Sequence, residues 1–275
     1  MVITKGSTSG ILKLSELPDG SYKAEFDRQY ADSEDKLPDL PDSIESSHGS
    51  RVWVDSFQHL KGIMDRYLAK HPKPEREFQQ VLARENNVSR LSNETEYFVT
   101  DIEFADREYG LRFDVLAVEW LASHRRSTDR FRPVLMEMKY GDDALGGDAG
   151  LTKHLQDIRE YVADGDKYRN LVEMTQRQFS QLDQLGLLQF NRTSRWQEIE
   201  VRTDIKPEVV LVLAGHNPRS TALRSIIDQE EIEAFANTDA FDLSFFVSTF
   251  AGYALHSACM LTLEEIRRIL HRHGR

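Results

Sequence analysis

The distribution of apolar and polar residues along the chain predicts a mixed α/β protein. Residues 11–26 read ILKLSELPDGSYKAEF and alternate apolar with polar side chains around PDG, which predicts a β-hairpin with Gly20 at the positive φ of its turn. Residues 30–50 are acidic and rich in serine and show no period, so we expect an exposed linker there. Apolar residues then recur at helical spacing from Val54 to Leu68, until HPKP ends this helix.

The central part of the chain predicts the order helix, three strands, helix, strand. A helix is expected from residue 75, strands over 97–106, 111–119 and 133–140, a long helical region over 150–186 divided near Gly165, and a buried strand over 207–215. The remainder predicts a helix over 220–237, an apolar stretch of ambiguous type over 241–255 and an amphipathic helix over 261–273. We therefore expect an N-terminal hairpin and linker (1–50), an α/β core with its preceding helix (51–220) and a helical C-terminal extension (221–275).

Two of the predicted strands carry charges where a core would exclude them. Asp114 lies inside LRFDVLAVE, and Glu137 and Lys139 lie inside PVLMEMKY. An isolated ionised side chain in an apolar environment costs several kcal/mol unless it is paired, hydrogen-bonded or bound to a metal. Residues two apart in a strand share a face, so Glu137 and Lys139 are expected side by side. With suitable register Asp114 and Glu137 would hold one hard cation, with the main-chain carbonyl of Met138 as a further ligand.

This arrangement predicts hydrolysis of a phosphodiester by a Mg²⁺- or Mn²⁺-dependent enzyme. The cation would lower the pKa of bound water and neutralise phosphate oxygens, and Lys139 would supply further positive charge. Glu75, on the buried face of the preceding helix with Phe78, Val81 and Leu82, is expected as a further direct or water-mediated ligand. Glu77 competes with Glu75 for this role, and Gln156 on the following helix could reach the same cleft.

The same residues resemble the motif of the PD-(D/E)XK nuclease superfamily. The resemblance covers roughly residues 75 to 215 and matches Glu75 in PEREFQQVL, Asp114 in RFDVL, Glu137 and Lys139 in EMK, and Gln156 with Tyr161 in HLQDIREYV. It implies a restriction-endonuclease-like core of order α-β-β-β-α-β, a mixed sheet flanked by helices, with the N- and C-terminal parts as additions. Phe113 departs from the family pattern, which has Pro before the Asp. The outline is also similar to anti-phage nucleases of the Shedu type, which implies defence against foreign DNA or DNA processing.

The charge of the chain restricts how it would bind nucleic acid. The 275 residues carry a net charge of −11, which repels a phosphate backbone, so binding needs local basic patches. Two basic clusters could supply such patches: the loop HRRSTDRFR between the two charged strands, and the C-terminal RRILHRHGR. The candidates for nucleic-acid contact are Arg125, Arg126, Arg130, Arg132 and Lys153. We expect a DNA endonuclease that acts alone, as a homo-oligomer or with a partner protein. An RNA-directed nuclease and an inactive nuclease-fold module that binds nucleic acid or a partner protein are the alternatives.

Other features of the sequence exclude several kinds of protein and binding site. Cys259 is the only cysteine, which excludes an intramolecular disulfide and a cysteine-based zinc site. No apolar run approaches the roughly 20 residues of a membrane-spanning helix and no signal-peptide pattern stands at the N-terminus, so we expect a cytoplasmic protein without membrane contact. No Gly-rich phosphate-binding loop is present. His154 is expected to be an exposed helix residue and His216 a loop residue, both without a role.

Overall fold

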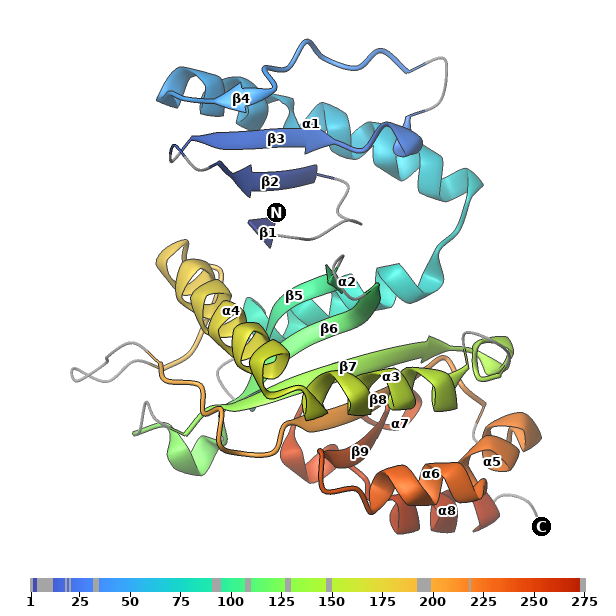
Figure 1. Cartoon of the computed structure of the whole chain (residues 1–275). Helices are drawn as coiled ribbons and strands as arrows, with labels where there is room; N and C mark the ends of the chain where they lie inside the picture. The colour runs from blue at the N-terminus through green and yellow to red at the C-terminus, as the bar shows by residue number, and fades with distance from the viewer. Residues whose placement is uncertain are drawn as a thin grey trace. The chain divides into compact units, whose positions relative to one another are not determined.

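The computed structural model describes residues 2–3, 12–17, 19, 21–31, 35–90, 95–106, 110–126, 130–146, 150–191, 199–217 and 219–272 (Figure 1). The chain divides into two compact units: the first comprises Met1–Pro74 and Glu103–Arg112, and the second comprises Glu75–Ile102 and Phe113–Arg275. The helix that follows residue 50, which we had assigned to the core, is therefore grouped with the N-terminal unit.

The first unit is built on a four-stranded sheet and one long helix. The strand order is β1 (Val2–Ile3), β2 (Leu12–Glu16), β3 (Tyr22–Phe26) and β4 (Ser43–Ile44). β2 and β3 pair antiparallel from Leu12↔Phe26 to Glu16↔Tyr22, which confirms the predicted hairpin; Gly20 lies outside the described residues. α1 (Ser47–Lys70) packs Trp53 and Leu60 against Ala24 of the sheet. It begins earlier than the apolar period suggested, because Ser46 caps it by accepting a hydrogen bond from the Gly49 amide at 3.3 Å.

The second unit is an α/β structure with a five-stranded mixed sheet, as predicted at this level of detail. Pro74 at the start of α2 and residues 103–112, which include the end of β5 and the start of β6, are counted in the first unit. The elements are α2 (Pro74–Asn87), β5 (Tyr97–Asp106), β6 (Leu111–Glu119), β7 (Arg132–Tyr140), α3 (Leu151–Ala163), α4 (Gly165–Gln184), β8 (Glu208–Ala214), α5 (Thr221–Ile227), α6 (Glu230–Ala236), β9 (Asp242–Val247), α7 (Ser248–Ala251) and α8 (Leu263–Arg272).

The strands of this sheet lie in the order of the sequence, β5-β6-β7-β8-β9. β6 and β7 pair antiparallel from Val115↔Met136 to Glu119↔Arg132. β7, β8 and β9 run parallel, with Glu137 opposite Leu211 and Lys139 opposite Leu213. The strand β7 therefore occupies the centre of the sheet, which explains why it is buried along nearly its whole length.

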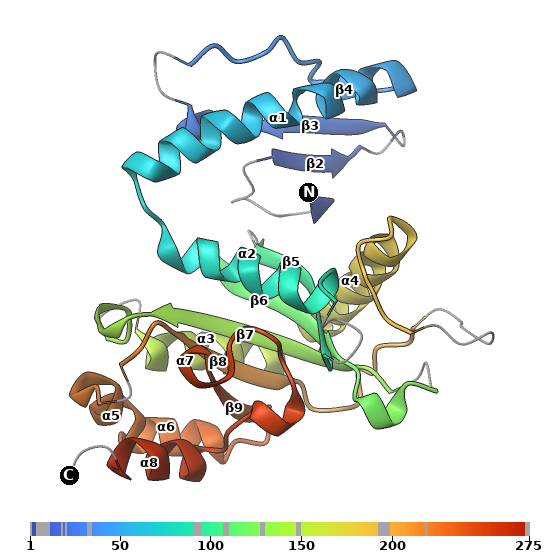
Figure 2. The ribbon, with the colours of Figure 1, turned by 180° about the vertical axis from the view of Figure 1, so that it is seen from behind.

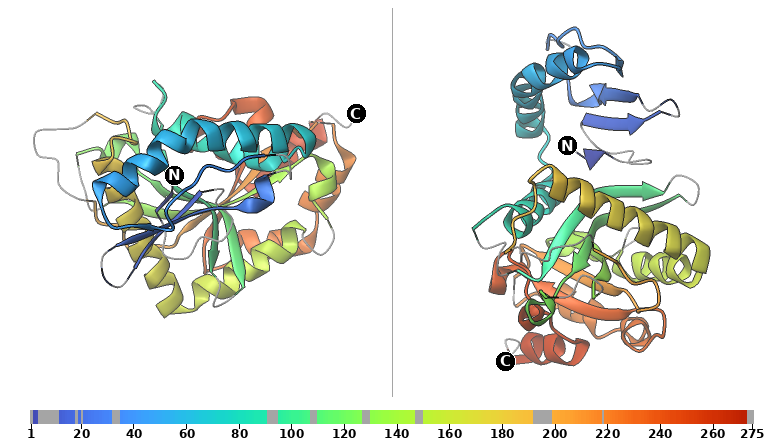
Figure 3. Two further views of the ribbon diagram at one scale, coloured as in Figure 1. Left: turned by 90° about the horizontal axis from the view of Figure 1, so that it is seen from above. Right: turned by 90° about the vertical axis from the view of Figure 1, so that its left-hand side faces the viewer.

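Helices cover both faces of this sheet, and the alternation of side chains decides which residue faces which helix. Tyr97 and Val99 pack in one apolar cluster with Leu82 of α2, whereas Phe98, between them in the strand, packs with Phe179 of α4. Figures 1 and 2 show α3 and α4 on one side of the sheet and α2 on the other, and the two views of Figure 3 agree. Glu137 and Lys139 alternate with Met136 and Met138 of the α2-side cluster, so they belong to the face that α3 covers.

The remaining elements refine the expectations from the sequence. The long helical region is divided at the expected place, between α3 and α4. The helix predicted over 220–237 is two helices, because Asp228 ends α5 and α6 begins a new turn with acidic residues. The ambiguous apolar stretch forms β9 and α7, and the predicted terminal helix is α8. In the described parts of the chain no helix combines the length and the apolar character needed to cross a bilayer.

Candidate active site

Asp114 lies against the central strand at the point where the β6–β7 ladder ends. The pairing that begins at Glu119↔Arg132 runs to Val115↔Met136. One residue further, the Asp114 carboxylate accepts a hydrogen bond from the Met138 amide, with Oδ2 2.9 Å from the nitrogen. The side chain therefore replaces a backbone acceptor in the ladder and brings its charge beside the segment that carries Glu137 and Lys139.

Glu137 is the most deeply buried acid of this group. Its side chain is 2% exposed, and its Oε1 atom lies 2.7 Å from Lys139 Nζ and 3.0 Å from His154 Nδ1. Neither contact at Oε1 meets the angular criteria of a hydrogen bond, so both are charge contacts.

The surroundings of Glu137 raise its pKa to about 8, chiefly through burial. The charge of Asp114 raises this pKa further, Lys139 lowers it, and Glu75 adds a smaller increase. Asp114 and Glu75 therefore act on the pKa of Glu137 in the same direction, and the Asp114 carboxylate reaches the Met138 amide next to Glu137. One lysine faces these carboxylates, so the cluster carries more negative than positive charge.

The helix α2 directs Glu75 toward the sheet and leaves Glu77 on the outside. Glu75 is half-buried and Glu77 is exposed, in agreement with the face defined by the buried Leu82. Gln79 lies one turn after Glu75 on the same face and is fully buried, and neither of its amide atoms has a hydrogen-bond partner. A buried amide without a partner is unusual in a folded protein, because its desolvation is not offset by a hydrogen bond.

The helix α3 brings His154, and not Gln156, to the acidic cluster. Gln156 donates to Glu160 and accepts from Arg159 at 2.5 Å, and it lines a groove between α3 and α6. Tyr161, the other helix residue of the family resemblance, is buried against Phe113 with ring centroids 5.3 Å apart. The expectation that His154 would be exposed and without a contact was wrong. Its spacing of three and four residues from the buried Leu151 and Ile158 could have placed it on the inner face.

His216 lies in the loop after β8, as expected, but it is buried and contacts the backbone of Lys139. Its Nε2 lies 3.2 Å from the Lys139 carbonyl oxygen, and its Nδ1 lies 3.1 Å from an Asp142 carboxylate oxygen. Asp142 in turn accepts a hydrogen bond from the Ser220 hydroxyl at 2.6 Å. These contacts fix the start of the loop that follows β7, including the 3-10 helix η3 (Asp142–Ala144). The sequence carried no periodic signal for this role.

The donor atoms of the cluster fit a hard divalent cation in chemistry and in charge. The side-chain donors of Asp114, Glu137 and Glu75 are all oxygens, which Mg²⁺ and Mn²⁺ prefer. Burial first, and the charge of Asp114 second, raise the pKa of Glu137, and a bound cation would favour its ionised form. Over the ranges that the structure describes, no group of three or more His, Cys, Asp or Glu side chains is already gathered in ligating geometry. Waters would therefore complete the coordination, as is usual for Mg²⁺.

The basic residues expected to contact nucleic acid fall into two classes. Arg126 and Arg130 are exposed, and Lys153 is exposed and paired with Asp157. Arg125 instead donates to the Thr95 carbonyl and stacks over Trp120, with its guanidinium carbon 4.6 Å from the ring centroid. Burial lowers the pKa of Arg125 to about 10, and its contacts with Thr95 and Trp120 give this side chain a role in packing.

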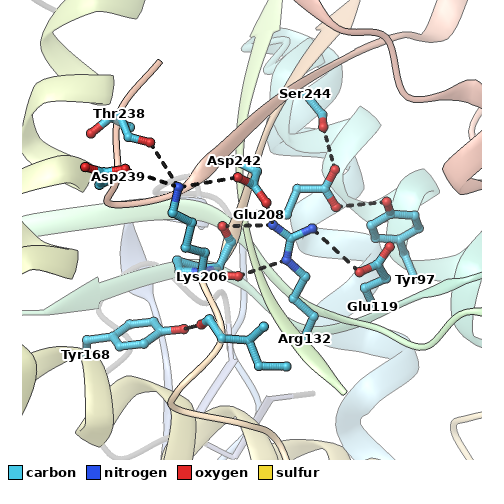
Figure 4. Close-up of polar contacts among 12 residues, drawn as sticks. Tyr97, Glu119, Arg132, Tyr168, Lys206, Glu208, Thr238, Asp239, Asp242 and Ser244 are labelled. Carbon is cyan, nitrogen blue, oxygen red and sulfur yellow. Dashed lines mark hydrogen bonds and ion pairs between the residues drawn. The ribbon is translucent and has the colours of Figure 1, made fainter. Parts of the chain in front are cut away.

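Arg132 lies at the opposite end of β7 from Lys139, inside a network of polar contacts (Figure 4). It donates to the Lys206 carbonyl at 2.9 Å and to the Asp242 carboxylate, and it lies 3.9 Å from a Glu119 carboxylate oxygen. Beside it, Glu208 accepts hydrogen bonds from Tyr97 at 2.9 Å and from Ser244 at 2.5 Å. Burial, followed by the charge of Glu208, raises the pKa of Glu119 to about 7. Arg132 therefore stabilises an internal acidic pair.

Comparisons of the chain with protein-family models, with curated proteins and with solved structures found no match.

Proposed function

We propose that this protein is a metal-dependent nuclease of the PD-(D/E)XK type that hydrolyses phosphodiester bonds, with DNA as the expected substrate. The observation that carries the proposal is the buried Glu137 carboxylate in the central strand, beside Asp114 and 2.7 Å from Lys139. Such a concentration of charge in a core costs stability and is typical of a functional site. The order α2, β5, β6, β7, α3 with α4, and β8 agrees with the restriction-endonuclease-like core that the sequence resemblance implies.

Each residue of the acidic cluster would have a separate role in binding the cation or the phosphate. Asp114 and Glu137 would hold the cation, with Glu75 as a direct or water-mediated ligand and the Met138 carbonyl as a main-chain donor. When bound, Mg²⁺ or Mn²⁺ supplies a water of lowered pKa and positive charge at the phosphate. Lys139, fixed by Glu137 at 2.7 Å and backed by His216, would place an ammonium where negative charge develops on the phosphate oxygens.

The test is cleavage by the purified protein with EDTA, Mg²⁺ or Mn²⁺. Plasmid DNA, linear duplex, single-stranded DNA and RNA serve as substrates, and the RNA arm tests the alternative that RNA is the substrate. Asp114→Ala and Lys139→Ala are expected to lose at least about a hundredfold in rate, because each removes a group that acts on the transition state. Glu75→Ala is expected to lose activity, whereas Glu77→Ala, an exposed acid of the same helix, should keep it. Equal cleavage by the parent and the Asp114 variant would refute the assignment.

An inactive module that binds nucleic acid is the second candidate, and one observation favours it. The Asp114 carboxylate already accepts the Met138 amide, and Lys139 already neutralises part of the charge of Glu137, so the described cluster is partly satisfied without a cation. Binding of DNA without cleavage of any substrate, under each metal condition, would support this candidate. Circular dichroism of every variant would separate loss of function from loss of folding.

A further inference from the structure

His154 is held at the acidic cluster by the inner face of α3. The buried Leu151, Leu155 and Ile158 anchor that face against the sheet, and His154 lies among them at helical spacing. The imidazole is 28% exposed, whereas the Glu137 carboxylate that it touches is 2% exposed. The histidine therefore lies on the solvent side of the buried acid.

The geometry of the contact suits two donors to one cation better than a hydrogen bond. His154 Nδ1 lies 3.0 Å from Glu137 Oε1, yet that oxygen accepts no hydrogen bond. Two neighbouring ligand atoms of an octahedral ion, each at about 2.1 Å from the metal, are separated by about 3.0 Å. The distance between this nitrogen and this oxygen would therefore suit His154 and Glu137 as neighbouring donors to one cation.

We propose that His154 is a nitrogen ligand of the divalent cation, and that the site therefore selects Mn²⁺ over Mg²⁺. This inference rests on the proposed function, since it concerns the same site. Carboxylates, carbonyls and waters serve Mg²⁺ and Mn²⁺ alike, but an imidazole nitrogen favours transition metals. Mg²⁺ also requires near-ideal octahedral oxygen coordination. One imidazole among oxygen donors therefore makes the site prefer Mn²⁺ to Mg²⁺. This imidazole belongs to His154, which is not part of the sequence motif.

The first experiment measures binding of each ion to the metal-free full-length protein by isothermal titration calorimetry, without nucleic acid. The parent is expected to bind Mn²⁺ at least about tenfold more tightly than Mg²⁺. His154→Ala should weaken Mn²⁺ binding by about tenfold or more and change Mg²⁺ binding much less, so that the selectivity falls. Thr152→Ala, on the same helix, is the matched control and should keep the parent selectivity.

The second experiment distinguishes a ligand from a residue that merely orients Glu137. Pulsed electron paramagnetic resonance of bound Mn²⁺ should show coupling to a ¹⁴N nucleus in the parent and not in His154→Ala. His154→Gln keeps an N–H that can contact Glu137 but lacks the imidazole, so restored selectivity in that variant would overturn the proposal. Circular dichroism checks that each variant is folded.

The outcomes separate this inference from the proposed function. If the parent binds neither ion, the metal-dependent function fails and the inference fails with it. If Glu137→Gln abolishes Mn²⁺ binding while His154→Ala leaves the Mn²⁺ to Mg²⁺ ratio and the ¹⁴N coupling unchanged, the metal site stands and the role of His154 is refuted. Loss of the ¹⁴N coupling together with loss of selectivity supports the inference.

Discussion

At the scale of single residues, the protonation of Glu137 links the stability of the protein to its chemistry. Burial raises the pKa of this acid to about 8 from an ordinary value of 4.5, and the Asp114 charge acts in the same direction. Burial of the Glu137 carboxyl therefore costs less free energy when the group carries its proton. A cation bound at the cluster would oppose both causes and favour the ionised form.

The first prediction concerns the pH dependence of folding in metal-free buffer with EDTA. Because the pKa of Glu137 is raised in the folded state, its protonation stabilises the protein fully below about 4.5, and this stabilisation is lost as the pH rises through about 8. Thermal unfolding of the parent between pH 5.5 and 9 should thus show a larger fall in Tm than that of Glu137→Gln.

The comparison of the parent with Glu137→Gln also controls for the other acids whose pKa is raised. The pKa values of Asp101 and Glu119 are raised to about 7, in both cases chiefly through burial, and both groups remain in the variant. Only the difference between parent and variant reports Glu137. Parallel Tm profiles for the two proteins would show that Glu137 does not titrate in this range.

At the scale of elements, the absence of a side chain at Gly215 allows β7, β8 and α2 to pack closely beside the acidic cluster. Gly215 follows β8 with φ of +67°, and a Cβ atom there would lie 2.6 Å from a ring carbon of Tyr140 at the end of β7. The Tyr140 ring in turn stacks on Phe78 of α2, with centroids 5.0 Å apart. The close approach therefore couples β7, β8 and α2 just beyond Lys139.

The second prediction compares two glycines of similar φ. Gly215→Ala should lower the free energy of unfolding by about 2–4 kcal/mol, since it adds a clash with Tyr140 to the cost of a left-handed backbone. Gly141→Ala has φ of +69° and nothing within 4 Å of its Cβ, so about 1–2 kcal/mol is expected. Urea unfolding measures both values. Equal losses would show that the Tyr140 contact is not tight.

At the scale of the whole molecule, net charge and local basic residues oppose one another. The charge of −11 repels a polyanion, so any attraction must come from exposed cations such as Arg126 and Arg130. Arg132 is not available to bind DNA, because its guanidinium already contacts the Asp242 carboxylate and the Lys206 carbonyl (Figure 4).

The third prediction separates surface arginines from the internal one. DNA binding, followed by fluorescence anisotropy at rising salt, should lose about one unit of slope in log K against log salt for each of Arg126→Ala and Arg130→Ala. Their stability should change by less than about 0.5 kcal/mol. Arg132→Ala should keep the slope but lose about 2–4 kcal/mol of stability, because Glu119 loses its cationic neighbour. A lowered slope in a stable Arg132 variant would contradict this division.

The sequence by itself determined the α/β class, the core strands and the presence of anomalous charges. Periodicity identifies an element from its own residues, and the cost of burying Asp114, Glu137 and Lys139 is visible without coordinates. It also favoured Glu75 over Glu77, because the face of an amphipathic helix follows from spacing alone.

Only the tertiary structure decided which side chains meet. It brought His154 to Glu137 and turned Gln156 toward α6, and it engaged Arg125 and Arg132 in internal contacts. These outcomes depend on strand register, on the rotation of α3 and on the path of distant loops. Such long-range geometry is set by packing between segments far apart in the chain, and no local pattern in the sequence encodes it.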